Sequence, residues 1–156
     1  MKINQSVEQG IYVALMLALQ KDHTPVKSSV LSGILQVSDS YMKKILRKMV
    51  VAGIITSGAG KEGGFQLARS VDEITVNDIY QAVDGGGTGI HISGIAHHIF
   101  VDDEKLSRNE SAVLSLFERA SAAYEDELKK MRLSELLIKE NYQNGWTDWA
   151  DRFTLS

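Results

Sequence analysis

The stretch SDSYMKKILRKMVVAG (residues 38–53) constrains the fold more than any other part of the chain. Ser38 is of a residue type that caps helix N-termini and Gly53 of one that ends helices, so the stretch predicts a helix running to about Val51. Its apolar residues recur at helical spacing and predict the inner face: Met42, Ile45, Leu46 and Met49. The other face gathers four cations: Lys43, Lys44, Arg47 and Lys48. A solvated face usually mixes charges, yet Asp39 is the only acid of this helix, so we expect a surface for a polyanion.

The next segment, GAGKEGG (residues 58–64), predicts a hairpin tip. It lies between the short runs GIITS and GFQLAR, in which apolar and polar residues partly alternate as they do in strands. A nucleotide-binding loop is excluded because Ile55 replaces its leading glycine and Glu62 its hydroxyl residue. We therefore expect Gly60 and Lys61 to approach the phosphates of a nucleic-acid backbone.

Two further helices are predicted before this unit, over residues 6–20 and 28–35, separated by Pro25. Their inward faces are expected to carry two sets of apolar residues: Ile11, Leu15, Ala18 and Leu19 in the first, and Val30, Leu31 and Ile34 in the second. Three helices followed by a hairpin are the outline of a winged helix-turn-helix, whose third helix enters the major groove of DNA. The expected fold class is mostly α with a small β-hairpin wing.

The charge distribution supports this interpretation. The net charge of -3 is unevenly distributed along the chain. Residues 1–70 contain nine Lys and Arg but only four Asp and Glu, so this part is basic. Residues 71–156 contain eight Lys and Arg and sixteen Asp and Glu, so this part is acidic. A basic half joined to an acidic half is expected when only one half meets a polyanion.

Other function classes are excluded by composition. The 156 residues include no Cys, which removes disulfides, thiol nucleophiles and cysteine-ligated clusters. No nucleophile, base and orienting group occur together, so we expect no enzyme and no cofactor. No run approaches a membrane span and no signal peptide begins the chain, so we expect a soluble cytoplasmic protein without a membrane partner.

Beyond these inferences, the sequence resembles the Rrf-two family of bacterial winged-helix transcription regulators, which includes the iron-sulfur cluster assembly regulator and the nitric-oxide-sensing repressor. The resemblance rests on VSDSYMKKILRKMVVAGIITS, GGFQLAR and EITVNDIYQAVDG, within the first 85 residues. It implies a homodimer that binds a near-palindromic operator on double-stranded DNA, with each third helix in a major groove and each wing toward a minor groove or the backbone.

Three departures limit what the resemblance carries over. Lys43 stands where members commonly have an acid used in base reading, so the operator preference should differ. Ala59 replaces an arginine of the wing, and we expect Lys61 to take over its phosphate contact. The cluster-binding cysteines are absent.

The region of those cysteines, residues 86–106, is expected to be a linker or sensor loop between a DNA-binding domain (1–85) and a dimerisation segment (107–156). It contains three histidines: His91, His97 and His98. They are candidate metal ligands, but the spacing matches no ligand motif, and we favour ordinary loop histidines.

A long helix is predicted from a capping box of Ser107 and Glu110 to about Met131. Its apolar stripe recurs at intervals of three and four: Val113, Phe117, Ala120, Tyr124, Leu128 and Met131. The stripe could dock on its own domain, but a helix this long is more economically covered by a second copy, so we predict homodimerisation. A short helix within residues 133–140 and aromatic residues from Tyr142 to Phe153 follow; the aromatics either pack on the dimer or line a small-molecule pocket.

We thus predict a dimeric, sequence-specific DNA-binding transcription regulator, expected to be a repressor. The sequence does not identify its operator or its effector, which could be a small molecule. The alternative is a winged-helix module that binds an acidic protein. Base edges and nearby phosphates are assigned to Ser40, Tyr41, Lys43 and Lys44 next to the Ser38 cap, and backbone contacts to Arg47 and Lys48. Arg69 either contacts DNA or pairs with an acid such as Asp72.

Overall fold

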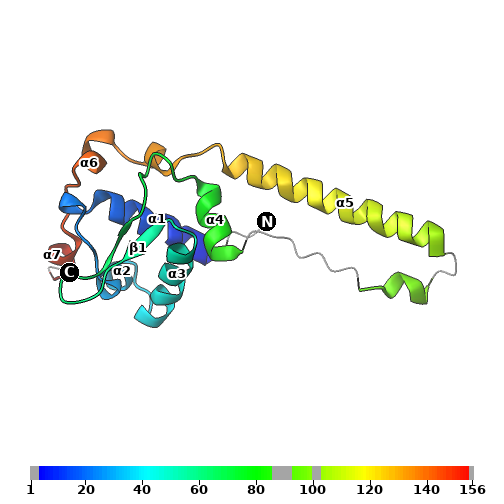
Figure 1. Cartoon of the computed structure of the whole chain (residues 1–156), viewed down its shortest axis with the longest axis horizontal. Coiled ribbons are helices and arrows are strands. Elements are labelled where there is room, and N and C mark those ends of the chain that lie inside the picture. Colours follow the sequence, from blue (N-terminus) through cyan, green and yellow to red (C-terminus); the bar gives the residue numbers. More distant parts are fainter. Residues whose placement is uncertain (1–3, 86–92, 100–102, 155–156) are drawn as a thin grey trace.

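The computed structural model describes residues 4–85, 93–99 and 103–154. Its elements follow in this order: α1 (Gln5–Leu19), η1 (Lys21–His23), α2 (Ser28–Ile34), α3 (Asp39–Val51), β1 (Ile55–Ser57), β2 (Phe65–Leu67), α4 (Val76–Asp84), η2 (Ile95–His98), α5 (Asp103–Leu128), η3 (Leu133–Leu136), α6 (Lys139–Gln143) and α7 (Trp149–Thr154). Figure 1 shows all of these except η2 and most of α5 gathered into one head, from which α5 projects.

Helix α1 lies at the centre of the head, capped by the Asn4 side chain. Its most deeply buried residues include Val13, Ala14 and Leu17. The prediction of which α1 residues face the core is only partly correct, since Ala18 is buried while Ile11 and Leu15 are half-buried. The helix is apolar almost all round, so periodicity alone does not identify its innermost face.

Helices α2 and α3 form the helix-turn-helix. Val30 and Leu31 of α2 are buried, as predicted. The chain then turns through Gln36, which has a left-handed backbone (φ 54°), and reaches the Ser38 cap. Tyr41 N donates to Ser38 Oγ, which confirms the predicted start of α3.

The predicted hairpin is the antiparallel pair β1–β2, in which Thr56 lies opposite Gln66. Backbone bonds between Gly58 and Gly64 extend it toward the tip. Val26 adds a bridge to Phe65, with both backbone bonds formed, and so attaches the wing to the segment before α2.

Helix α4 begins with a capping box of Thr75 and Asp78 and ends at Gly85, whose φ of 85° is left-handed. It packs closely against α1, because a Cβ at Gly10 would lie 2.8 Å from Ile79. This contact positions α4 against α1 in the core of the winged domain.

The long helix differs from the prediction at both ends. It begins at Asp103, so Ser107 and Glu110 lie inside it and do not form a capping box. It ends at Leu128, so Met131 lies in the following extended segment, where its carbonyl accepts from Val76 N. The capping pattern was misleading because its residue types also occur within polar helices.

The C-terminal segment returns to the head. Leu133 is fully buried in the core and Trp149 is 7% exposed. The indole of Trp149 donates to Met16 O at 2.7 Å, and α7 lies beside α2. The short helix expected within residues 133–140 is present as η3, and α6 begins at Lys139.

The architecture is therefore mostly helical with a two-stranded wing, as predicted. The division at residues 85 and 106 stays a prediction, although the tail packs with the first domain. Over residues 4–85, 93–99 and 103–154, no helix has both the length and the apolar content that a bilayer crossing requires.

Candidate nucleic-acid interface

Helix α3 has a buried face and a cationic face. The predicted inner residues are all at most 2% exposed: Met42, Ile45, Leu46 and Met49. This anchoring turns the opposite face outward, where the four cations are exposed: Lys43, Lys44, Arg47 and Lys48. The helix thus presents a basic surface on a rigid support.

The N-terminal end of this surface is polar. Ser38 caps the helix and its hydroxyl lies 3.3 Å from that of Ser40. Tyr41 is 36% exposed, so part of its side chain is accessible to a partner. These groups stand where helix-turn-helix proteins read base edges.

Lys43 forms an ion pair with Asp39 one turn earlier, with Nζ 2.6 Å from Oδ2. The hydrogen bond from Lys43 is the main cause that lowers the pKa of Asp39, so this carboxylate is ionised at neutral pH. The pair neutralises part of the surface and orients the Lys43 side chain along the helix.

Lys48 differs from its neighbours because its ammonium donates to Val83 O at 2.7 Å. This bond ties α3 to the last turn of α4, where carbonyl groups lack helical partners. Across the part of the chain that the structure describes, Lys44 and Arg47 make neither hydrogen bonds nor ion pairs through their side chains. Of the four cations on α3, these two are the most available to an incoming phosphate.

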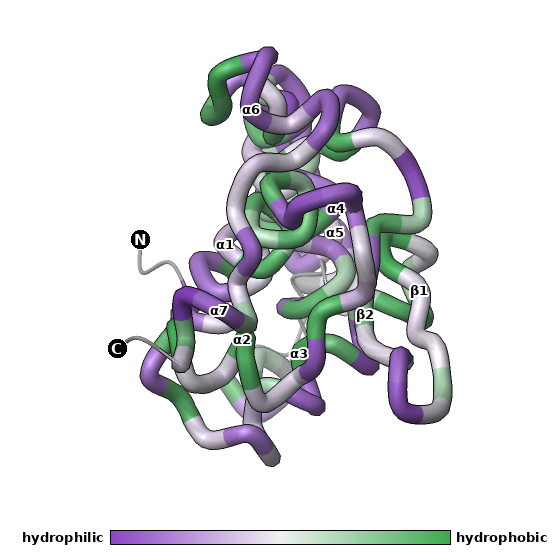
Figure 2. Tube along the Cα trace, turned by 90° about the vertical axis from the view of Figure 1, so that its left-hand side faces the viewer, coloured by the Kyte–Doolittle hydropathy of each residue, from purple (hydrophilic) through white to green (hydrophobic). Residues whose placement is uncertain are grey.

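The wing tip has the geometry that its glycines predict. Gly60 has φ 94°, a conformation that L side chains rarely adopt. A Cβ at Gly63 would lie 2.4 Å from Gly58 O, whereas a Cβ at Gly58 would meet nothing closer than 3.8 Å. Lys61 is exposed at this tip, which Figure 2 shows as a hydrophilic stretch of the hairpin.

Arg69 has a structural partner, but it is not Asp72. Its Nη2 lies 3.4 Å from Asp78 Oδ1, within the capping box of α4. A long bond to Glu73 O completes its contacts. Several acids lie near Arg69 in the sequence. Asp78 becomes its partner because the first turn of α4 places this carboxylate next to the guanidinium.

The histidine region adds no described metal site. His91 lies outside the described residues, as does the side chain of His97, while His98 is exposed. Within residues 4–85, 93–99 and 103–154, no group of three or more His, Asp or Glu side chains is arranged to hold a metal ion.

The winged core, basic third helix and glycine hairpin agree with a family comparison. The model of the Rrf2 family, described as an iron-dependent transcriptional regulator, matches residues 3–139.

The chain belongs to the Rrf2 family.

Its Rrf2 relatives are regulators and not enzymes. The chain is 30% identical over 154 residues to YffB of Lactococcus lactis, named as an HTH-type transcriptional regulator, covering 97% of this chain and 98% of YffB. It is 37% identical over 100 residues to YwgB of Bacillus subtilis, likewise named, covering 64% of each chain.

Solved Rrf2 structures share the fold. CymR, the global cysteine regulator of B. subtilis, superposes with a TM-score of 0.61 at 22% identity, over 87% of this chain and 95% of CymR. The T. potens IscR structure has a TM-score of 0.61 at 20% identity, over 94% and 93%. At these identities the likeness establishes architecture alone.

Sequence reasoning missed the tertiary partner of Lys48. Val83 is 35 positions away, and no local pattern connects a lysine to that carbonyl. The left-handed Gly85 that ends α4 was the available signal, because it marks a helix end whose carbonyls need donors.

Proposed function

We propose that this Rrf2 protein is a dimeric, sequence-specific DNA-binding repressor of a near-palindromic operator. Helix α3 of each subunit enters a major groove, and each wing tip approaches a minor groove or the backbone. Base edges and adjacent phosphates are contacted by Ser40, Tyr41, Lys43 and Lys44, and the backbone by Arg47, Gly60 and Lys61. Occupancy of the operator excludes other proteins from the promoter. The protein acts in the cytoplasm, where its DNA lies.

One observation carries this proposal: one face of α3 is buried in the core, while exposed cations on α3 and the wing make no described ion pair. Lys44, Arg47 and Lys61 make no described ion pair, although acids are plentiful in the chain. Cations kept free in this way release counterions from DNA when they bind its phosphates. Lys48 is assigned instead to the contact between α3 and α4, where it donates to Val83 O and stabilises the DNA-binding unit.

Dimerisation is supported by apolar surface that one subunit leaves uncovered. On α5, Val113, Leu116 and Phe117 are each at least 50% exposed. The C-terminal part of the stripe is half-buried at Tyr124 and Leu128, and the rings of Tyr124 and Tyr80 meet edge-on with their centroids 5.4 Å apart. The N-terminal part of α5, which carries these exposed residues, projects away from the head (Figure 1), where a second α5 would cover it.

The head offers a second apolar surface for the partner. A groove of about 560 Å³ along α1 is lined by Glu8, Ile11, Tyr12, Leu15 and Leu136. Tyr12 is 49% exposed and Leu136 48%. Ile11 and Leu15 belong to the face of α1 that the sequence predicts to be buried, and a partner helix would bury them.

Selection of sites from a random duplex library with the full-length protein tests the function. We expect one enriched sequence with two related half-sites in inverted orientation, because a two-fold dimer presents two equal α3 helices. Enrichment of a single half-site would contradict the dimer. Failure to enrich any sequence would contradict specific DNA binding and favour an acidic protein as the partner.

Repression is tested separately with a reporter that carries the selected operator across its promoter. Expression should fall when the regulator is supplied and recover when Arg47→Ala is supplied instead. Activation by the regulator would contradict the repressor role while leaving the DNA-binding proposal intact.

A further inference from the structure

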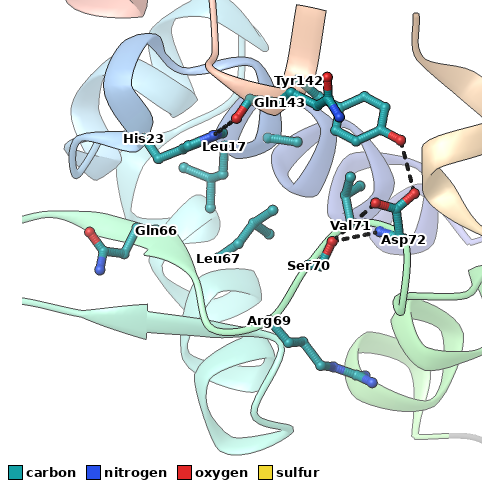
Figure 3. Close-up of a pocket in the computed structure, with 11 residues that line it drawn as sticks. Leu17, His23, Gln66, Leu67, Arg69, Ser70, Val71, Asp72, Tyr142 and Gln143 are labelled. Carbon is teal, nitrogen blue, oxygen red and sulfur yellow. Dashed lines mark hydrogen bonds between the residues drawn. The ribbon is translucent and has the colours of Figure 1, made fainter. Parts of the chain in front are cut away.

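The C-terminal tail, residues 142–154, is fastened to the head at its start by two hydrogen bonds, which Figure 3 shows. The Tyr142 hydroxyl donates to Asp72 Oδ1 at 2.9 Å, in the loop after β2. His23 Nε2 lies 3.1 Å from Gln143 O, in the turn after α1. The tail is thus attached at two places before it turns toward the helix-turn-helix.

The next part of the tail lies against the end of α1, backbone to backbone. Trp146 N and Thr147 N both donate to Leu19 O. A Cβ at Gly145 would lie 1.9 Å from Gln20 O, so only glycine permits this approach. These contacts hold the tail to one path along the end of α1.

Helix α7 is anchored by Trp149. Besides the indole bond to Met16 O, the backbone N of Trp149 donates to Gln20 Oε1 at 3.3 Å. Gln20 is only 4% exposed, and its amide nitrogen donates to Thr24 Oγ1 at 3.0 Å, in the connection that leads to α2. A buried amide with both its oxygen and its nitrogen bonded favours a single arrangement of the groups around it. The start of α7 therefore has a fixed position relative to the connection before α2.

The far end of α7 lies on α2. A Cβ at Gly33 would be 2.1 Å from Phe153 Cε2, so the Phe153 ring occupies the place where α2 lacks a side chain. Figures 1 and 2 both show α2 between α7 and α3, and it packs against each of them. A helix of seven residues has little stability of its own, so the position of α2 depends on the helices that flank it.

Helix α2 in turn reaches the part of α3 that we assign to base edges. After Lys43, the hydroxyl of Ser28 is the next cause that lowers the pKa of Asp39. The Asp39 carboxylate holds the Lys43 ammonium in the ion pair at the start of α3. A shift of α2 would move Ser28 relative to Asp39 and would change how Lys43 is held.

We propose that Phe153 is a positioning residue of the helix-turn-helix. Its ring, seated on Gly33, sets the position of α2 and, through α2, that of the N-terminal end of α3. Phosphate contacts attract any duplex, whereas base contacts distinguish one sequence from another. Loss of the ring should therefore reduce the choice between sequences more than the attraction to DNA in general. This inference rests on the proposed function, because positioning is measured through DNA binding.

A double-mutant cycle between positions 33 and 153 in the full-length protein tests the proposal. Phe153→Ala removes the ring, and Gly33→Ala adds a methyl group that displaces it. Each single substitution should weaken the operator obtained by site selection by at least about threefold. The scrambled duplex should be affected less, and the salt slopes should not change, because no phosphate contact is lost. In the Phe153→Ala background, Gly33→Ala should weaken the operator no further.

Two control variants show whether the ring on Gly33 is responsible. Phe153→Leu keeps an apolar group on α2 and should restore most of the operator affinity. Trp146→Ala removes a ring of the same tail that is 67% exposed, and it should bind the operator as wild type does. Chemical denaturation and sedimentation of every variant establish that it is folded and has the wild-type oligomeric state under the conditions of the DNA measurement.

Three results would overturn the inference: additive losses at positions 33 and 153, equal weakening of the operator and the scrambled duplex, or a loss of stability in Phe153→Ala with unchanged operator affinity. The last result is the one that a purely structural contact would give. If the wild-type protein selects no operator, the proposed function fails and the positioning role fails with it. If it selects an operator that Phe153→Ala binds equally well, only the positioning role is rejected.

Discussion

At the scale of the residue, Arg47 and Lys48 carry the same charge on adjacent positions of α3, but only Lys48 donates to a carbonyl of α4, so we propose different roles for them. Arg47→Ala should lower DNA affinity and reduce the slope of log affinity against log salt by about one, with unfolding free energy changed by less than about 0.5 kcal/mol. Lys48→Ala should lower the unfolding free energy by about 1 kcal/mol, because the bond to Val83 O is lost, and should leave the salt slope nearly unchanged.

Chemical denaturation and DNA titration of both variants check this pair. Equal effects of the two substitutions on the salt slope would show that Lys48 also contacts phosphate. A stability loss confined to Arg47→Ala would contradict both assignments.

Lys43 is predicted to affect operator choice. Lys43→Glu places an acid one turn from Asp39, so the ion pair is replaced by repulsion and base edges meet an acceptor instead of a donor. We expect a second selection from random duplexes to return a different preferred sequence. If every duplex is weakened equally, Lys43 contacts phosphate and the base-reading assignment is wrong.

Local sequence patterns identified the orientation of α3 but not its partners. The spacing of Met42, Ile45, Leu46 and Met49 predicted the inner face, and all four are buried. The partners of Lys48 and Arg69 depend on where α4 begins and ends in space. Such contacts between elements are set by packing, which the residues near each cation do not encode.

At the scale of the element, the wing tests whether backbone shape supports DNA binding. Gly63→Ala would place a Cβ 2.4 Å from Gly58 O and force the tip to move. We expect operator and random duplexes to be weakened by a similar factor, since Lys61 loses its position, with core stability retained. Gly58→Ala, where the nearest atom is 3.8 Å away, is the control and should bind as wild type. Titration of both variants against both duplexes decides, and normal binding by Gly63→Ala would remove the wing from the interface.

Helix α5 is the element on which the proposed dimer depends. Phe117→Asp places a charge in the stripe, where Phe117 is 50% exposed in one subunit and would be covered in a dimer. We expect monomers by sedimentation, because an unpaired charge in an apolar interface costs several kcal/mol. Ala122→Asp, on the opposite face of α5, should remain dimeric. A dimer in both variants would place the interface elsewhere.

The elements differ in how far the sequence could define them. The start of α3 follows from the Ser38 cap and the wing from its glycines, because both are local requirements. The beginning of α5 was misplaced because Ser107 and Glu110 imitate a cap inside a continuous helix. The return of Trp149 to α1 joins residues 133 positions apart, and neither segment indicates the other.

At the scale of the whole molecule, the basic surface and the projecting α5 form one arrangement. The first 70 residues carry the positive balance and hold α3 and the wing, while the acidic remainder forms α5 and most of the tail. This separation keeps the acids of the chain from competing with DNA for Lys44, Arg47 and Lys61. A regulator organised in this way should bind DNA through charge and select its operator through the end of α3.

The measurement that tests this account most directly is the salt dependence of binding to the selected operator and to a scrambled duplex of equal length. We predict that both affinities fall linearly on a log–log scale, because phosphate contacts release counterions, and that the operator is bound at least about a thousandfold more tightly. Lys61→Ala should reduce both slopes by about one. Affinity that is independent of salt, or equal for the two duplexes, would contradict the claim that α3 and the wing form a sequence-specific DNA-binding surface.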